Sequence, residues 1–204
     1  MKKKELVFIL DCSGSMSGLE ADTVGGFNSM IAKQKKSEGE VRVTTVMFAD
    51  SCHYLHDRLP LGEVKKMKVN DYQVGGCTAL IDALGKTITA FEERCGQDTD
   101  VLMVITTDGQ ENASKHYCLK DVRKMIERNQ ERGWEFIFLG ANMDAVAEAA
   151  AYGIRNDRAA RFANDSRGIG TNYEVMSEVL GCIINDEEIP EDWAEKIRED
   201  YRSR

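Results

Sequence analysis

The sequence predicts an α/β protein of the Rossmann-like, doubly wound class, with a mostly parallel six-stranded sheet and helices on both faces. The apolar runs 6–10 and 101–105 are continuous, which is typical of strands buried on both faces. Segments with helical periodicity separate the strands, as in a parallel sheet with crossover helices. If the two halves of the chain wind outward in opposite directions through right-handed crossovers, the strand order is 3-2-1-4-5-6.

Length, composition and charge exclude several classes of protein. The 204 residues suffice for a proper core, and 42% hydrophobic with 30% charged residues is ordinary for a globular protein. A net charge of −8 disfavours a nucleic-acid partner, which requires a basic surface. The apolar run after the lysines at 2–4 is too short for a signal peptide, and no segment reaches transmembrane length. A cytoplasmic location without a membrane partner is expected.

The opening strand 6–10 leads directly into a polar segment, 11–18, that contains an aspartate, three serines and two glycines. Ligands of open parallel sheets bind at the carboxyl ends of the strands. Asp11, Ser13 and Ser15 offer only oxygen atoms there, which suits magnesium better than zinc or copper. The alternative is a serine-rich turn that caps the next helix, and this motif alone leaves the two interpretations level.

The first half of the chain continues with a helix and a hairpin. Apolar residues at helical spacing between 24 and 31, followed by lysines, predict an amphipathic helix. Residues 41–49 form the next strand, and 52–59 form a more polar strand that returns as an antiparallel edge. His53 and His56 lie three residues apart, so a strand points them to opposite faces. We interpret them as solvated edge residues and not as a metal site.

The second half of the chain carries two further polar sites. After the irregular segment 61–76, Thr78 stands before a helix with apolar positions from 80 to 95, where its simplest role is an N-cap. The strand 101–105 runs into Thr106-Thr107-Asp108-Gly109, which places a second carboxylate at a strand end. The remaining elements are a helix over 119–133, a strand over 136–139, a helix over 143–152, a short strand over 161–163 and a helix over 175–184.

The predicted strand order brings these polar segments together. The strands 6–10 and 101–105 become neighbours at the point where the winding reverses, so Asp11 and Asp108 meet at the same edge. Thr78 lies on the loop between them. Because three separate parts of the chain converge, a capping role for each no longer suffices.

These residues resemble the metal-ion-dependent adhesion site of von Willebrand factor A-type domains, in a bacterial or phage cytoplasmic form, over roughly residues 5–184. The D-x-S-x-S motif at Asp11, Ser13 and Ser15, together with Thr78 and Asp108, matches that site in order and in context. The resemblance implies that the hydroxyls hold Mg²⁺ or Mn²⁺, while the two aspartates act largely through water and hydrogen bonds. It also implies a binding module and no enzyme, with an AAA-type ATPase as a candidate partner.

The ligand types support the binding role that the resemblance implies. Neutral hydroxyls leave the charge of an octahedral cation poorly compensated, so an aspartate or glutamate from a partner protein is attracted to its open position. We expect Glu111 to weaken or orient the incoming acid through like-charge repulsion. The rim of the site is expected to consist of Met16, Leu19, Gln110, Glu111, Asn112 and Asn142.

Two other functions fit parts of the pattern. A haloacid-dehalogenase-like phosphatase or phosphotransferase would use Asp11 as nucleophile and Asp108 to help hold Mg²⁺, but it needs an acid as proton donor where Ser13 stands. A flavodoxin-like nucleotide binder would use residues 13–18 as phosphate loop. The two aspartates would repel phosphate unless a metal intervened, and no G-x-G-x-x-G motif is present.

The predicted domain covers residues 1–184, and residues 185–204 form a charged amphipathic tail. Pro190 stands at the expected helix start, and Trp193, Ile197 and Tyr201 follow at helical spacing. We expect this face to pack on the domain, with a partner-binding helix as the alternative.

The six cysteines lie far apart without a C-x-x-C pair, which indicates reduced thiols in a chain without a secretory signal. Cys12 and Cys77 adjoin the metal motif. We interpret both as small buried residues, with a redox switch on metal binding as the alternative.

Overall fold

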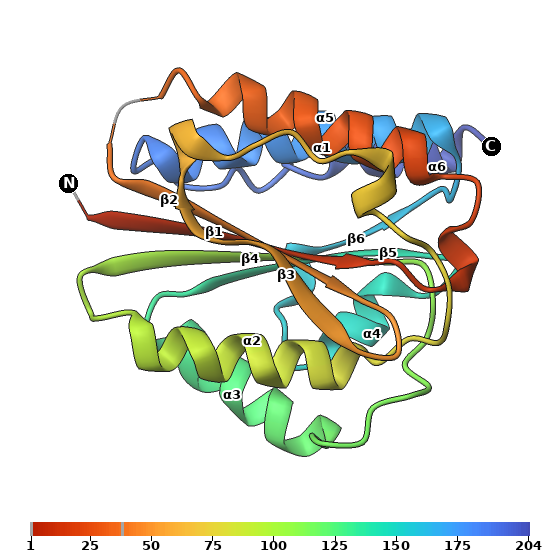
Figure 1. Cartoon of the computed structure of the whole chain (residues 1–204), viewed down its shortest axis with the longest axis horizontal. Helices are drawn as coiled ribbons and strands as arrows, with labels where there is room; N and C mark the ends of the chain where they lie inside the picture. Colours follow the sequence, from red (N-terminus) through yellow and green to blue (C-terminus); the bar gives the residue numbers. More distant parts are fainter. Residues whose placement is uncertain (1, 38) are drawn as a thin grey trace.

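A computed structural model, which describes residues 2–37 and 39–204, shows one twisted sheet between two layers of helices (Figure 1). The strands are β1 (Lys3–Asp11), β2 (Val41–Phe48), β3 (Cys52–Pro60), β4 (Thr99–Thr107), β5 (Glu135–Ala141) and β6 (Ala159–Phe162). The helices are α1 (Glu20–Gln34), α2 (Leu80–Arg94), α3 (Leu119–Glu131), α4 (Ala145–Ala151), α5 (Ser166–Ile184) and α6 (Glu195–Arg202). Helices α1, α5 and α6 cover one face, and α2, α3 and α4 cover the other.

The strand order is β3-β2-β1-β4-β5-β6, which confirms the predicted doubly wound topology. All neighbouring pairs are parallel except β2 with the edge strand β3. Strand β1 pairs with both β2 and β4, and Leu10 lies opposite Thr106. The carboxyl ends of β1 and β4 therefore lie side by side at the point where the winding reverses.

The continuous apolar run of β1 serves two separate parts of the core. Leu6, Phe8 and Leu10 pack beneath α1 and α5, whereas Val7 and Ile9 pack against the helices on the opposite face. All five side chains are at most 2% exposed. Burial of each large apolar side chain contributes about 1.5–3 kcal/mol, so both faces hold the strand in place.

Helices α5 and α6 begin far from their predicted starts. Helix α5 begins at Ser166, nine residues before the expected start, because Asp165 caps it by accepting a bond from the Gly168 amide at 2.9 Å. The glycines and polar residues of its first turns obscure the apolar periodicity. Helix α6 begins at Glu195 and not at Pro190, because residues 191–194 form a turn.

The C-terminal tail packs on the domain, as expected from its apolar stripe. The side chains of Trp193 and Ile197 are buried, and the indole N–H of Trp193 donates to the Asp157 carbonyl at 2.8 Å. The Arg161 guanidinium lies 4.5 Å from the centre of the Tyr201 ring, which attaches α6 to β6. None of the helices in residues 2–37 and 39–204 is long and apolar enough to cross a membrane.

All six cysteines are free thiols, in agreement with the prediction. Cys12 is buried and its thiol donates to the Phe48 carbonyl at 3.1 Å. Burial raises the pKa of Cys12 to about 11, which disfavours the reactive thiolate. Cys77 is exposed, so its interpretation as a buried residue was wrong.

The interpretation of His56 as a solvated edge residue was also wrong. His53 is exposed, but His56 is buried, with hydrogen bonds from Nδ1 to Thr45 Oγ1 and from Nε2 to the Lys65 carbonyl, each at 3.1 Å. Register shifts between β2 and β3 interrupt the regular alternation of the edge strand. His56 therefore connects the edge strand to the segment after it.

Titration of His56 should make the protein less stable in acid. Burial lowers the pKa of His56 below its usual value of 6.5, so folding favours the neutral imidazole. Its contribution is complete above pH 6.5 and is lost as the pH falls through the lowered pKa. Urea unfolding from about pH 7.5 down to about pH 5 should show a smaller loss of stability in His56→Gln than in the wild type. His53→Gln is the control, and an unchanged slope in His56→Gln would contradict the assignment.

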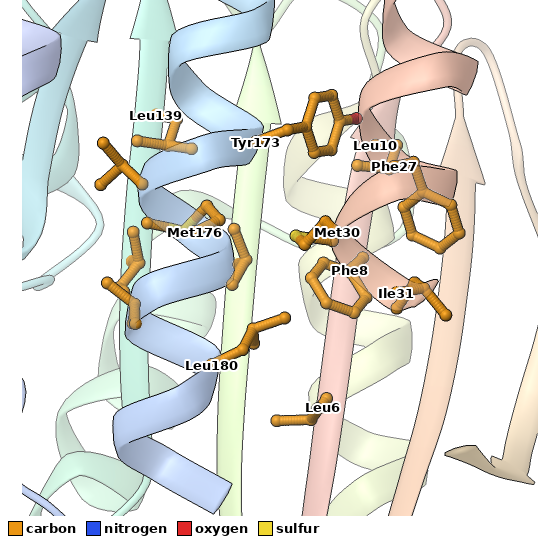
Figure 2. Close-up of a cluster of buried hydrophobic side chains, with 14 of the residues drawn as sticks. Leu6, Phe8, Leu10, Phe27, Met30, Ile31, Leu139, Tyr173, Met176 and Leu180 are labelled. Atoms are coloured by element: carbon orange, nitrogen blue, oxygen red, sulfur yellow. The ribbon is translucent and has the colours of Figure 1, made fainter. Parts of the chain in front are cut away.

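Helices α1 and α5 approach each other closely at one glycine. Figure 2 shows the Tyr173 ring extending from α5 toward α1 among the buried side chains. A Cβ atom added at Gly26 would lie 2.2 Å from this ring, whereas one added at the neighbouring Gly25 would meet no atom within 4 Å. The contact therefore requires glycine at position 26 and leaves position 25 free.

Alanine at these two adjacent positions should have opposite effects on the free energy of unfolding. Gly26→Ala should destabilise by about 1–3 kcal/mol because the buried tyrosine must move. Gly25→Ala should stabilise by about 0.5–1 kcal/mol because alanine favours the helix. Urea unfolding of both variants tests the contact. Equal effects of the two substitutions would show that the helices are not in close contact there.

Candidate metal centre

Three loops meet at the carboxyl edge of β1 and β4, and backbone hydrogen bonds hold them together. The loop after β1 is joined to the loop before α2, because the Gly14 amide donates to the Gly76 carbonyl at 3.1 Å and the Gly75 amide to Cys12 at 2.9 Å. The loop after β4 is joined to the same segment by the Asn112 amide, which donates to the Thr78 carbonyl at 3.0 Å. The polar side chains of all three loops are thus fixed in one place.

Asp11 is the innermost side chain of the site and is 1% exposed. Its Oδ1 accepts a hydrogen bond from the Ser13 amide at 2.7 Å, and its Oδ2 accepts one from Thr107 Oγ1 at 2.6 Å. Burial raises the pKa of Asp11, and the nearby Asp108 adds to this effect, whereas the bonds from Ser13 and Thr107 oppose it. The carboxylate is oriented from both sides by the protein.

Asp108 is joined to the serines of the first loop. The Ser15 hydroxyl donates to Asp108 Oδ1 at 2.5 Å, and Ser13 Oγ lies 3.1 Å from Ser15 Oγ. The second oxygen of Asp108 accepts a bond from Asn164 Nδ2 at 2.8 Å. Ser13 and Asp108 are buried, whereas Ser15 is exposed. The cluster therefore opens to the surface at Ser15.

The expected N-cap role of Thr78 is not observed, because α2 begins later and other side chains bind its first amides. The Glu111 carboxylate accepts from the Ile81 amide at 2.8 Å, and Ser114 Oγ accepts from the Asp82 amide at 2.9 Å. Thr78 is buried, and its hydroxyl faces the position of Gly109.

Hydroxyl oxygens from two separate loops lie close to the position of Gly109. A Cβ atom added at Gly109 would lie 3.0 Å from Thr78 Oγ1 and 3.6 Å from Ser15 Oγ. Hydroxyl and carboxylate oxygens are ligands for hard divalent cations. The residues therefore fit a cation such as Mg²⁺. No group of three or more His, Cys, Asp and Glu side chains suited to a metal occurs in residues 2–37 and 39–204, so any cation here relies on hydroxyls.

The predicted rim is only partly correct. Met16 and Leu19 are buried in the core. Glu111 is not a free charge, because its Oε1 accepts from the amides of Ala113 and Ser114 at 2.9 and 2.7 Å. The rim residues that remain exposed are Gln110, Asn112 and Asn142.

The structure gives Thr107, Asn164 and Tyr72 roles at the site that the sequence did not predict, and it gives the expected rim residue Asn112 a contact with the site. Thr107 and Asn164 each bind one of the site's aspartates, as described above. Tyr72, from the irregular segment, donates its hydroxyl to the Asp11 carbonyl, and Asn112 Oδ1 accepts from the Thr78 amide at 2.9 Å. The sequence carried one signal that could have identified Asn164: it is a polar residue shortly after a strand, as Asp108 is.

A doubly wound sheet with an oxygen-lined cluster where its winding reverses defines a class of α/β proteins that bind ligands at this edge. The family model of the von Willebrand factor type A domain matches residues 5–168. The chain belongs to this family. No curated protein matches the chain.

Solved structures share the fold at low sequence identity. Proximal thread matrix protein 1 from the mussel byssus, with zinc in its metal-ion-dependent adhesion site, is 15% identical with a TM-score of 0.67 over 88% of this chain and 46% of its own. The pilus adhesin SpaC from Lactobacillus rhamnosus GG is 13% identical with a TM-score of 0.70, over 91% of this chain and 31% of its own. Manganese-loaded TRAP protein from Plasmodium vivax is 14% identical with a TM-score of 0.59, over 84% of this chain and 73% of its own. The chain spans less than half of the mussel protein.

Thr107 should stabilise the fold through its bond to Asp11. Thr107→Val keeps the shape of the side chain but removes the donor to a buried carboxylate, so it should lower the free energy of unfolding by about 1–3 kcal/mol. Thr106→Val, on the opposite face of the same strand, is the matched control and should have a smaller effect. Urea unfolding in the presence of EDTA measures both, and equal stabilities would contradict this role of Thr107.

Proposed function

We propose that this chain is a metal-dependent protein interaction module that captures an acidic side chain of a partner protein. One Mg²⁺ or Mn²⁺ would be held at the site of Asp11, Ser13, Ser15, Thr78 and Asp108. The observation that carries the proposal is the position of Gly109, where an added Cβ would lie within 3.6 Å of the hydroxyls of both Thr78 and Ser15. These hydroxyls come from separate loops and meet beside two aspartates.

The division between neutral and charged oxygens favours capture of an external acid. Asp11 and Asp108 each accept hydrogen bonds from the protein at both carboxylate oxygens. Both carboxylates are thus engaged, and the hydroxyls that remain as direct ligands are neutral. The cation therefore supplies unbalanced positive charge at an open position, and a partner's carboxylate gains a charge-assisted interaction there.

The accessible part of the site suits a protein partner. Ser15 is exposed, and the polar side chains Gln110, Asn112 and Asn142 lie on loops at the same edge of the sheet. Such a rim can form hydrogen bonds around a docked acidic residue. An AAA-type ATPase that presents an aspartate or glutamate is a candidate partner inside the cell.

The manganese-loaded and zinc-occupied relatives support a divalent cation. Hydroxyl and carboxylate ligands favour Mg²⁺ or Mn²⁺ over Zn²⁺. The site does not favour a phosphotransferase, because Asp11 is 1% exposed and both of its oxygens accept hydrogen bonds. A nucleophile needs an accessible oxygen, and the acid that would donate a proton is absent at Ser13.

Removal of one hydroxyl should weaken the metal site without unfolding the protein. Calorimetric titration with Mn²⁺ should show binding to the wild type and at least about tenfold weaker binding to Ser15→Ala. Ser17→Ala, at an exposed serine of the same loop, should bind Mn²⁺ as the wild type does.

The captured acid is tested on the same protein: acetate should lower the water-proton relaxation of the Mn²⁺-loaded wild type by displacing bound water, and EDTA should abolish the effect. Equal Mn²⁺ affinity in wild type and Ser15→Ala, or no effect of acetate, would contradict the proposal.

A further inference from the structure

The Asp108 carboxylate accepts a hydrogen bond from a residue that follows β6, an edge strand of the sheet. Asn164 lies in the turn between β6 and α5, and β5 separates β6 from β4 in the sheet. Its side chain nevertheless reaches Asp108 Oδ2 at 2.8 Å, while Ser15 occupies Oδ1 at 2.5 Å. Asn164 thus completes the set of donors that orient this carboxylate.

The side-chain amide of Asn164 has one hydrogen-bond partner among the described residues, which is Asp108. Its Oδ1 is buried and accepts no hydrogen bond from residues 2–37 and 39–204. A buried polar atom without a partner is unfavourable, so burial alone does not explain why an asparagine occupies this position. The bond from Nδ2 to Asp108 does explain it.

The turn that carries Asn164 is attached on two sides. A Cβ atom added at Gly168 would lie 2.0 Å from the Ala163 carbonyl oxygen, so the first turn of α5 lies directly against this turn. The Ser166 hydroxyl donates to Asp22 on α1 at 2.6 Å. Small displacements of α5 or α1 would therefore move Asn164.

A third attachment comes from Arg204, which follows the end of α6 at Arg202. Arg204 forms ion pairs with Asp165, next to Asn164, and with Asp200, the latter at 2.7 Å. Asp200 is buried and also pairs with Arg167 on α5 at 2.6 Å. Figure 1 shows the C-terminal end of the chain at the same end of the sheet as the loop after β1. These contacts form a chain of polar interactions from α6 through the turn to Asp108.

We propose that Asn164 is a positioning residue for the metal centre and that α6, through Arg204, holds it against Asp108. This inference rests on the proposed function, because it concerns the regulation of the same site. When Arg204 holds Asp165, Asn164 keeps Asp108 oriented toward the position that a cation would take. Release of α6 frees the turn and weakens the site. Coupling of this kind is reciprocal, so cation binding must also stabilise the docked α6.

The experiment compares four variants by calorimetric titration with Mn²⁺ alone: Asn164→Ala, Arg204→Ala, the double variant and the control Arg202→Ala. We expect about tenfold weaker binding in Asn164→Ala, as for residues that orient metal ligands. Arg204→Ala should weaken binding about threefold, since a partly exposed ion pair has a small effect. Arg202 pairs with Glu195 of its own helix at 3.0 Å, so its removal should leave Mn²⁺ affinity unchanged.

Two further readouts distinguish positioning from a general loss of structure. Arg204→Ala should have no additional effect on Mn²⁺ affinity in the Asn164→Ala background, because both act through one contact. Hydrogen exchange of the α6 amides should slow when Mn²⁺ binds the wild type, and this change should disappear in Asn164→Ala. Additive effects of the two substitutions, or equal protection of α6 by Mn²⁺ in both proteins, would overturn the proposed coupling.

The outcomes separate this inference from the proposed function. If the wild type does not bind Mn²⁺, the proposed function fails and the positioning role fails with it. If the wild type binds Mn²⁺ and Asn164→Ala binds it equally well, only the positioning role is overturned.

Discussion

The parallel pairing of β1 with β4 is the constraint on which the site depends. It places Asp11 and Asp108, both buried, beside each other at one edge of the sheet. Two carboxylates in such a position repel each other and lose hydration, which the protein must compensate. The surrounding donors Ser13, Ser15, Thr107 and Asn164 supply that compensation. A divalent cation would supply more of it.

In the three loops around this pair, the side chains that cap α2 differ from those whose hydroxyls lie beside Gly109. Glu111 and Ser114 satisfy the first amides of α2, so the Thr78 hydroxyl is not needed as a cap. Gly109 has no side chain to fill the space that Thr78 and Ser15 face. The loop before α2 is therefore held by Glu111 and Ser114, and the Thr78 hydroxyl is left beside Gly109.

The relatives of known structure share the fold with this chain at 13–15% identity. A fold retained at such identity depends on the pattern of buried residues more than on their exact types. In this chain the rim at Gln110, Asn112 and Asn142 is exposed and not needed for the core. The fold therefore tolerates substitutions at these exposed positions.

The sequence by itself determined the strand order, the helical layers and the convergence of Asp11, Ser13, Ser15, Thr78 and Asp108. Each rests on a local signal: continuous apolar runs, helical periodicity, or a polar residue just after a strand. Only the tertiary structure decided the burial of His56, the engagement of Glu111 and the bond from Asn164 to Asp108. These depend on a register shift at an edge strand and on contacts between distant segments. No local pattern encodes such contacts, because they form only when the whole sheet is assembled.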